Sequence, residues 1–349
     1  MTTYFKERII AFSELGTLFK ENIDKKENKK FPEWDLLLEE TLIESKSYNT
    51  WFTIDNLKLS LNNWSKSLEE NILFDWLSKY NIEDKSKKRI AIIMAGNIPA
   101  VGFHDLLCSL LLNFDCLVKL SSDDKLLIPF IVRFLESRNK KLKNKVVFES
   151  KKLKNFDGVI ATGNNNSHRY FDYYFSKYPN LLRKTRHSIA VLDGNESDKD
   201  LSNLSNDIFN YFGLGCRSVS KVFLPKGYDL DLLFNAFFIH KEIINHNKYA
   251  NNFDYNKAVY LMSNEKFIEN GFLILKKETK LGSPIGCLFY EFYDNEEDIT
   301  KLILNNSDSI QCVASNLNLK TNIQFGQTQC PNISDYADSN DTIKFLLKI

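Results

Sequence analysis

Apolar residues recur at helical spacing from the start of the chain to about residue 85. The pattern begins with Phe5, Ile9 and Ile10, and it continues through tryptophan-containing segments to Trp76. Such spacing gives each helix one apolar face, and aromatic residues at these positions usually pack in a core. Residues 1–88 are therefore predicted to form a helical region that packs on the next domain and carries no visible chemistry.

From Arg89 onward the pattern changes to short apolar runs that alternate with helical segments. Residues 89–94 and 116–120 are nearly continuous apolar runs, which is typical of strands buried on both faces. Further strands are predicted at 145–149 and 157–161, with helices at about 100–113 and 123–138. This alternation predicts a nucleotide-binding domain with a parallel sheet at residues 89–192, closed by a strand at 187–192.

A second α/β unit, the catalytic domain, is predicted at residues 193–318. Its helices are expected at 197–212, 229–247, 251–262 and 295–304, and its strands at 219–224, 285–292 and 309–315. Residues 319–349 are expected to return to the cofactor domain and to contribute an oligomer interface. The predicted fold class is therefore α/β, with two parallel-sheet domains and a helical N-terminal extension.

The stretch from Asn206 to Pro225 is the most informative part of the sequence. A helical segment ends in Phe212-Gly213-Leu214-Gly215, a single cysteine follows at Cys216, and a strand begins just after it. Two glycines around one leucine allow a tight turn that would present Cys216 at the mouth of a sheet. We interpret Cys216 as a covalent nucleophile; the alternative is a buried structural cysteine.

Composition narrows the class of protein. The chain has 349 residues, is 43% hydrophobic and carries a net charge of +1, so no strong field attracts nucleic acid or membrane. The sequence begins without a signal pattern and lacks a long apolar span, which predicts a cytoplasmic protein with no membrane span and no nucleic-acid partner. The six cysteines are spread widely in a chain that begins without an export signal, so disulfides are not expected. They show no CxxC spacing and the histidines show no ligand spacing, so no metal site is expected.

Several short motifs follow one another in a characteristic order: Gly96–Pro99, Leu117–Ser121, Ala161–Asn164, Phe212–Cys216, Ser283–Gly286 and Phe325–Pro331. This order resembles the aldehyde dehydrogenase superfamily, and most closely its LuxC-type acyl-CoA reductase (fatty acid reductase) branch. The resemblance extends from about Lys88 to the end of the chain. It implies an aldehyde-dehydrogenase-like fold with two Rossmann-like domains.

The resemblance also implies roles for individual residues. Cys216 would be the nucleophile, and Asn97 would donate a hydrogen bond to the oxyanion. The cofactor-binding residues would be Lys119, Ser121, Ser122, Thr162, Gly163 and Asn164. Arg217 follows Cys216 directly, but successive residues of an extended chain point in opposite directions, so it is interpreted as a surface or packing residue. His168 and His187 match no family motif and are interpreted as solvated or structurally bonded histidines.

Three departures from the family pattern bear on the chemistry. Val191 is compared with the glutamate that activates water in hydrolytic relatives, and a valine cannot take a proton, which would favour transfer to a thiol. Asp193 lies two residues later, and a shifted register could give it a role in place of that glutamate. Ser283 replaces a glutamate that would hold the nicotinamide ribose. Ser122 replaces an acidic residue beside the adenosine ribose, so NADPH is favoured over NADH.

The resemblance therefore implies NADPH-dependent reduction of an acyl thioester to an aldehyde through an acyl-cysteine. The donor would be a long-chain acyl-CoA or an acyl-protein; the latter would require an acyltransferase or acyl-protein synthetase partner. A homo-oligomer is expected by analogy. Two alternatives stay open: a CoA-acylating dehydrogenase of short aldehydes, and a degenerate homologue that binds nucleotide or a partner without catalysis.

Overall fold

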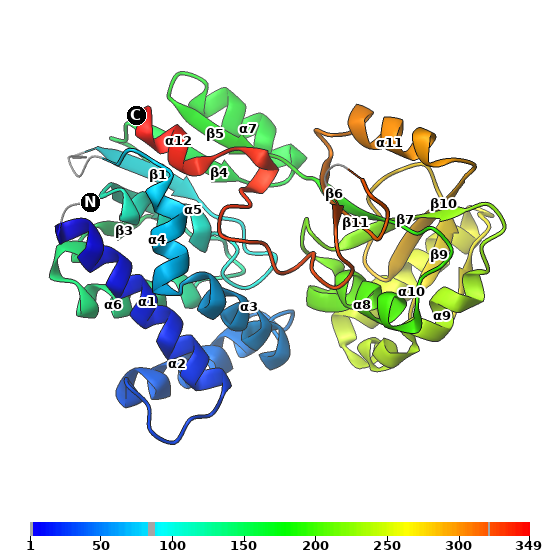
Figure 1. Cartoon of the computed structure of the whole chain (residues 1–349), viewed down its shortest axis with the longest axis horizontal. Helices are drawn as coiled ribbons and strands as arrows, with labels where there is room; N and C mark the ends of the chain where they lie inside the picture. Colours follow the sequence, from blue (N-terminus) through cyan, green and yellow to red (C-terminus); the bar gives the residue numbers. More distant parts are fainter. Residues whose placement is uncertain (1–2, 83–87, 320–321) are drawn as a thin grey trace. The chain divides into compact units, whose positions relative to one another are not determined.

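The computed structural model describes residues 3–82, 88–319 and 322–349. The chain forms two compact units: unit 1 comprises Met1–Lys184 with Asn332–Ile349, and unit 2 comprises Thr185–Pro331 (Figure 1). Across the described ranges, none of the helices combines the length and apolar character needed to cross a membrane.

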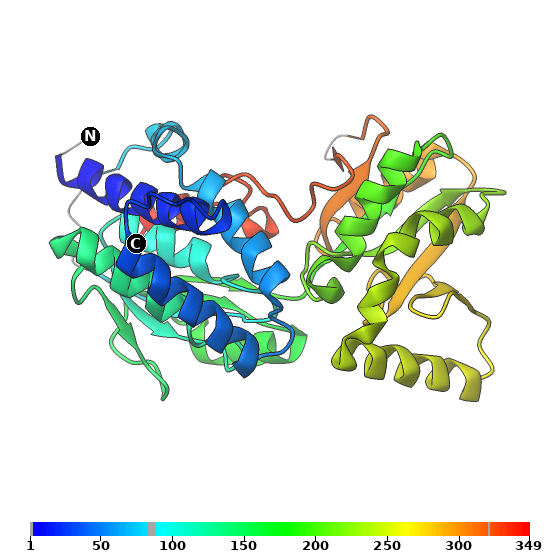
Figure 2. The same cartoon turned by 90° about the horizontal axis from the view of Figure 1, so that it is seen from below.

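Unit 1 begins with four helices, as the apolar spacing predicts. They are α1 (Thr3–Ile23), α2 (Pro32–Tyr48), α3 (Ile54–Ser67) and α4 (Glu70–Ser78), drawn in blue in Figures 1 and 2. Helix α1 packs against α2, α3 and α4. Phe12, Leu15, Leu38 and Leu57 are fully buried between them, so these apolar positions form a core rather than a binding surface.

The sheet of unit 1 has five parallel strands in the order β3-β2-β1-β4-β5. These strands are β1 (Arg89–Ile93), β2 (Asp115–Lys119), β3 (Val146–Phe148), β4 (Gly158–Thr162) and β5 (Asn180–Arg183). Helices α5 (Phe103–Leu111), α6 (Leu127–Arg138) and α7 (Asn165–Phe175) and the short helix η1 (Lys140–Leu142) connect them. Because β1 pairs with both β2 and β4, the winding direction reverses beside β1, where such sheets bind ligands.

Both faces of this sheet are covered. Ile90 and Ile92 join the core formed with the N-terminal helices, whereas Ala91 and Val159 pack on the opposite face near Phe171 of α7. Alternate residues of one strand therefore enter two different cores. This double burial explains why β1 is an almost uninterrupted apolar run in the sequence.

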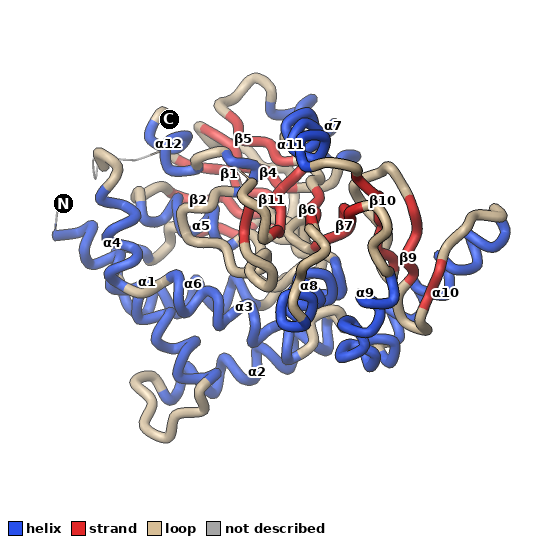
Figure 3. The backbone as a smooth tube through the Cα atoms, turned by 45° about the vertical axis from the view of Figure 1, so that its right-hand side comes forward, coloured by secondary structure: helices blue, strands red, loops and turns tan. Residues whose placement is uncertain are grey.

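Unit 2 contains a seven-stranded sheet in the order β12-β11-β6-β7-β10-β9-β8. The strands are β6 (His187–Val191), β7 (Val219–Pro225), β8 (Ile268–Glu269), β9 (Ile274–Lys277), β10 (Cys287–Tyr293), β11 (Ile310–Ser315) and β12 (Asn322–Ile323). The helices are α8 (Asp198–Phe209), η2 (Asn210–Gly213), α9 (Leu230–Phe237), η3 (Phe238–Asn245), α10 (Asn247–Met262) and α11 (Glu296–Asn305). Figure 3 shows α8 and α9 beside the strands of this sheet. Only β8 pairs antiparallel among the described strands.

The change of unit falls at Lys184–Thr185, one strand earlier than the expected boundary at residues 192–193. Strand β6 pairs with β7 and β11, so it belongs to the second sheet rather than closing the first. At the other end, Asn332–Ile349 belongs to unit 1 and includes η4 (Ala337–Ser339) and α12 (Thr342–Leu347). This tail is fastened there by the Trp76 indole, which donates to the Tyr336 hydroxyl at 2.9 Å.

Candidate active site

The turn before Cys216 has an unusual backbone. After α8 ends, Tyr211, Phe212 and Gly213 all adopt left-handed conformations, with φ of 54°, 57° and 75°. Each non-glycine residue in this region costs about 1–2 kcal/mol. Tyr211 and Phe212 are buried, and the ring of Phe212 lies 4.4 Å from the ring of His246, so packing offsets the strain. The sequence indicated a glycine-based turn, but two aromatic residues share this conformation with Gly213.

Cys216 is exposed at the end of this turn, which excludes the buried structural alternative. The Ser188 hydroxyl, at the start of β6, donates to the Cys216 carbonyl at 2.9 Å. The same hydroxyl lies 2.9 Å from the sulfur of Cys312. The Ser218 N–H donates to the Gly215 carbonyl at 3.0 Å. The thiol therefore projects from a backbone that is tied to the sheet.

Three other cysteines are in a different environment. Cys108, Cys116 and Cys287 are buried, and desolvation raises the pKa of each thiol, to about 12 for Cys287. Such thiols stay protonated and unreactive near neutral pH. Exposure therefore separates Cys216 from these buried cysteines as a candidate nucleophile; Cys330 is also exposed.

The loop that contains Ser283 lies beside the Cys216 turn. Ser283 and Gly286 line a small cavity of about 20 Å³ together with Phe212 and Gly213, room for one water molecule. The Ser283 hydroxyl donates to the Cys287 carbonyl at 2.7 Å, so it is already engaged by its own loop. At Gly286, φ is 78° and a Cβ atom would lie 3.1 Å from the backbone of Phe253, so only glycine fits this close approach.

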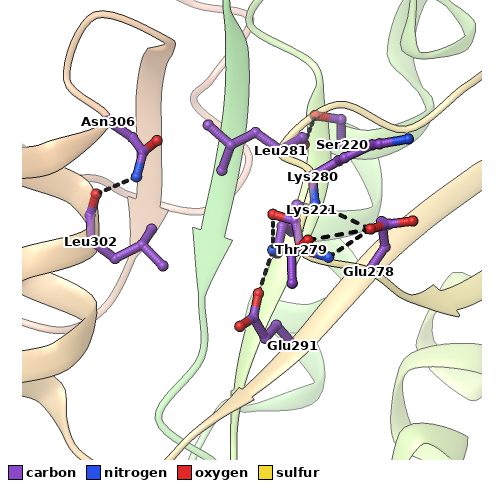
Figure 4. A network of polar contacts seen from close by, with 9 residues as sticks. All are labelled: Ser220, Lys221, Glu278, Thr279, Lys280, Leu281, Glu291, Leu302 and Asn306. Atoms are coloured by element: carbon purple, nitrogen blue, oxygen red, sulfur yellow. Dashed lines mark hydrogen bonds and ion pairs between the residues drawn. The ribbon is translucent and has the colours of Figure 1, made fainter.

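A buried lysine fixes the start of the same loop (Figure 4). The Lys221 ammonium, in the middle of β7, donates to the Thr279 carbonyl at 3.0 Å and to the Glu291 carboxylate at 2.6 Å. The hydroxyl of Ser220 donates to the Leu281 carbonyl at 2.9 Å. Two adjacent residues of β7 therefore hold the segment that leads to Ser283.

The C-terminal motif of unit 2 also reaches the Cys216 turn. The Arg217 Nε–H donates to the Thr328 carbonyl, and the Gln329 amide donates to the Ser218 hydroxyl at 3.0 Å. Arg217, interpreted from the sequence as a surface or packing residue, thus has a defined backbone partner. The motifs around Cys216, Ser283 and Phe325–Pro331, far apart in the sequence, come together in one unit.

In unit 1 the predicted oxyanion residue and the predicted cofactor residues follow three neighbouring strands. Asn97 follows β1; Lys119, Ser121 and Ser122 lie at the end of β2 or just after it; Thr162, Gly163 and Asn164 lie at the end of β4. Since β2, β1 and β4 are adjacent and parallel, these residues share one edge of the sheet. This edge lies where the winding of the sheet reverses.

The loop that contains Asn97 is held by the buried carboxylate of Asp124. Asp124 accepts a hydrogen bond from the Ala100 N–H at 2.8 Å, and the Ser60 hydroxyl donates to the Pro99 carbonyl at 2.9 Å. Ala100 is left-handed, with φ of 55°. Desolvation raises the pKa of Asp124 to about 6. Asn97 itself is exposed at the top of this braced loop.

The turn after β4 offers donors to an anion. Asn164 caps α7 by accepting from the Ser167 N–H at 2.8 Å, and a Cβ at Gly163 would lie 2.8 Å from the Ser167 side chain. Backbone N–H groups at a helix N-terminus favour phosphate groups. Lys119 adds a positive charge at the same edge of the sheet. This donor set fits the phosphates of a dinucleotide.

The comparison of Val191 with a water-activating glutamate is not supported. Strand β6 starts beside Cys216, where Ser188 contacts it, and runs parallel to β7 away from the turn. Val191 is fully buried at the far end of β6. Asp193 follows the strand, and in the direction of the strand it lies roughly 15 Å beyond Ser188. Neither residue can act on the Cys216 thiol, so Val191 gives no information about hydrolysis. The local sequence similarity did not reveal the direction of the strand.

The two histidines considered in the sequence occupy separate places. His168 lies on α7 in unit 1, whereas His187 opens β6 in unit 2. The His187 ring packs so closely on Gly282 that a Cβ there would lie 2.1 Å from it. Burial lowers the pKa of His187, which therefore stays neutral near pH 7. This packing supports its structural interpretation.

Solved structures of aldehyde dehydrogenases share the fold of this chain. Aldehyde dehydrogenase 21 from Physcomitrella patens, in complex with its product succinate, matches with a TM-score of 0.67 at 11% identity, over 99% of this chain and 84% of that chain. KauB, an aldehyde dehydrogenase from Pseudomonas aeruginosa, gives 0.67 at 12% identity, over 98% and 82%. The NAD⁺ complex of an aldehyde dehydrogenase from Bacillus cereus gives 0.59 at 14% identity, over 90% and 72%. The chain thus has the aldehyde dehydrogenase fold.

The family follows from the sequence match. The model of the acyl-CoA reductase (LuxC) family matches residues 7–233, and the chain belongs to this family. A search among curated proteins finds no match. Family and fold together support an oxidoreductase that acts on aldehyde or acyl groups.

Proposed function

We propose that this protein reduces a long-chain acyl thioester to the aldehyde with NADPH, through an acyl intermediate on Cys216. The observation that carries the proposal is the exposed Cys216 thiol on a strained, anchored turn in a chain of the acyl-CoA reductase (LuxC) family. Only a thiolate is an effective nucleophile, and an exposed thiol ionises more readily than the buried ones.

The reaction begins at the Cys216 sulfur. The thiolate attacks the thioester carbonyl, the C–S bond to the carrier breaks, and the carrier leaves as a thiol. NADPH, when bound, supplies the hydride that reduces the acyl-cysteine carbonyl. The resulting thiohemiacetal on Cys216 collapses, which releases the aldehyde and regenerates the thiolate.

Oxyanion stabilisation is assigned to the Asn97 amide and the Cys216 backbone N–H. A developing negative oxygen needs preorganised donors, and the loss of one such donor typically lowers the rate by about 10²–10³-fold. The contacts of Asp124 and Ser60 to the Asn97 loop support this assignment because they restrict its backbone.

Cofactor binding is assigned to residues of unit 1, and the nucleophile to unit 2. Lys119, Ser121 and Ser122 would contact the adenosine ribose, and the N-terminus of α7 would receive the pyrophosphate. Solved aldehyde dehydrogenases with NAD⁺ bound support a nicotinamide cofactor. NADPH is preferred in the proposal because Ser122 brings no negative charge to repel a 2′-phosphate.

The acyl donor is a long-chain acyl-CoA or an acyl-protein, by analogy with the family. In the second case an acyltransferase or acyl-protein synthetase would supply the substrate. A cytoplasmic homo-oligomer fits the same analogy. The main alternative, a CoA-acylating dehydrogenase of short aldehydes, uses the same cysteine chemistry and differs in the length of the acyl chain.

A chain-length series tests the proposal. Purified protein is given acyl-CoA substrates from acetyl-CoA to tetradecanoyl-CoA, and the loss of NADPH or NADH absorbance is recorded with aldehyde formation. We expect the highest kcat/KM with long chains and NADPH, and no turnover by Cys216→Ala. Faster reaction with acetyl-CoA would favour the short-chain alternative. Undiminished turnover by Cys216→Ala would contradict the acyl-cysteine mechanism.

A further inference from the structure

We propose that Asp207 is a positioning residue for Cys216, acting through the segment Phe325–Gln329. Asp207 fixes this segment, and the segment holds the two residues that follow Cys216. The inference rests on the proposed function, because positioning matters for catalysis only if Cys216 is the nucleophile.

Asp207 is a buried carboxylate that accepts three hydrogen bonds from one distant segment. It lies on α8 with 1% exposure. One oxygen accepts from the Gly326 N–H at 2.6 Å, and the other accepts from the N–H and hydroxyl of Thr328 at 3.0 and 2.7 Å. A buried carboxylate needs such donors, so the segment and Asp207 satisfy one another.

The segment Phe325–Gln329 also contacts the two residues that follow Cys216. The Thr328 carbonyl accepts from Arg217 Nε, and the Gln329 amide donates to the Ser218 hydroxyl at 3.0 Å. Gly326 has φ of 83°, and a Cβ there would lie 3.1 Å from the side chain of Asn203, so the backbone is closely fitted to α8. Asp207 thus fixes Thr328, and Thr328 orients Arg217, the neighbour of Cys216 in the chain.

This arrangement has an electrostatic consequence. A positive charge near a thiol favours the thiolate. In this proposal the charge is that of the Arg217 guanidinium, which is oriented by its hydrogen bond to the Thr328 carbonyl. Desolvation raises the pKa of Asp207, while the bonds from Gly326 and Thr328 and the charge of Arg217 oppose that rise. The carboxylate and the guanidinium therefore support one another through Thr328.

The shape of the carboxylate matters as well as its charge. In Asp207→Asn, one acceptor oxygen becomes an NH₂ group that faces a donor. The amide can then accept from Thr328 or from Gly326, but not from both. The segment would lose part of its attachment while the volume of the side chain is unchanged.

The experiment compares the alkylation of Cys216 by iodoacetamide across pH in four proteins, with Cys216 resolved from Cys330 by peptide mass spectrometry. These are the parent, Asp207→Asn, Thr328→Val and the control Asp198→Asn, an exposed aspartate in the first turn of α8. We expect Asp207→Asn to move the pH midpoint upward and to slow alkylation at pH 7 about tenfold, equivalent to about one pH unit. Thr328→Val, which loses one of the three donors, should shift in the same direction by about threefold, and Asp198→Asn should match the parent.

In the full reaction, Asp207→Asn should lower kcat and leave the KM for NADPH unchanged, because its contacts lie in the unit that carries Cys216. If both Asp207→Asn and Thr328→Val alkylate like the parent, the proposal is overturned. Thr328→Val keeps the test decisive if Asp207→Asn does not fold. Slower alkylation in the variants of a parent whose Cys216 never accepts an acyl group would support Asp207 as a positioning residue and overturn the proposed function instead.

Discussion

Tyr211 and Phe212 adopt a left-handed backbone directly before Cys216, and glycine is the residue that tolerates this region best. Strained conformations of this kind persist where the surrounding packing holds them, and they cluster at functional sites. Here the rings are buried, while the chain that follows carries an exposed thiol. The strained backbone of Tyr211 and Phe212 thus accompanies the exposure of the Cys216 thiol.

Gly213→Ala tests this link. Its φ of 75° should make the variant about 1–2 kcal/mol less stable. Gly227→Ala is the matched control, since Gly227 has φ of 84° and open space where a Cβ would be. We expect a similar loss of stability in both, measured by calorimetry, but slower alkylation of Cys216 only in Gly213→Ala. Equal alkylation in the two variants would contradict a role for the turn in presenting Cys216.

Asp124 predicts how the stability of unit 1 depends on pH. Burial raises the pKa of this carboxyl group from its ordinary value of 3.8 to about 6 in the folded chain, so the folded state keeps a proton that the unfolded state has lost. Stability should therefore fall as the pH rises from 4 to 6, by about 3 kcal/mol from this group. Asp124→Asn should lack this decline, whereas the exposed neighbour variant Asp123→Asn should keep it.

Tryptophan fluorescence suits this measurement. All four tryptophans, Trp34, Trp51, Trp64 and Trp76, lie in unit 1, so urea unfolding followed by their emission reports that unit. The difference between parent and Asp124→Asn at each pH cancels the other titrating groups. A difference that stays constant from pH 4 to 7 would show that Asp124 does not titrate in this range.

At the scale of elements, strands buried on both faces could be predicted, and short strands with buried charges could not. Strand β5 ends in Arg183, which is buried because it pairs with Asp105, and β9 contains Lys276, paired with Glu265 and Glu278. A charged residue in a sequence normally indicates a position exposed to solvent. These strands therefore lacked the apolar pattern by which a buried strand is predicted. The partners that bury the charges are distant in sequence, and no local pattern reveals them.

Lys221 offers a test of how such an internal charge supports an element. Lys221→Met removes the bonds to Glu291 and Thr279, and we expect a loss of about 2–3 kcal/mol, below the range for fully buried pairs because Glu291 is partly exposed. Lys226→Met is the control, since the side chain of Lys226 is 81% exposed beside Asp294 and such pairs contribute about 0–1 kcal/mol. Calorimetry of the full-length variants measures both losses of stability, since Lys221 and Lys226 lie in unit 2. Equal losses would mean that Lys221 does not hold the loop.

At the scale of the whole molecule, two α/β units could be predicted, but the exact course of the chain between them could not. Strand β6 has the same apolar character as the strands of unit 1, and only its pairing with β7 and β11 assigns it to unit 2. The order of the motifs predicted the fold because the motifs are distributed from Gly96 to Pro331. The position of Val191 was misjudged because a single short motif does not show which end of a strand it occupies.

For the candidate site, the family resemblance pointed to Cys216, to Asn97 and to the turns after β2 and β4, and these roles stay predictions. It did not identify Asp207, whose partners Gly326 and Thr328 lie more than 100 residues further along the chain. Buried polar contacts of this range depend on the complete fold.

The most direct test of the central claim is to trap the acyl group on Cys216. Parent protein is incubated with tetradecanoyl-CoA without NADPH, and its peptides are analysed by mass spectrometry. We predict an acyl adduct on Cys216, its absence in Cys216→Ala, its presence in Cys330→Ala, and its release as aldehyde when NADPH is added. A parent protein whose Cys216 stays unmodified with every acyl-CoA of the series, or whose adduct lies on Cys330, would contradict the account.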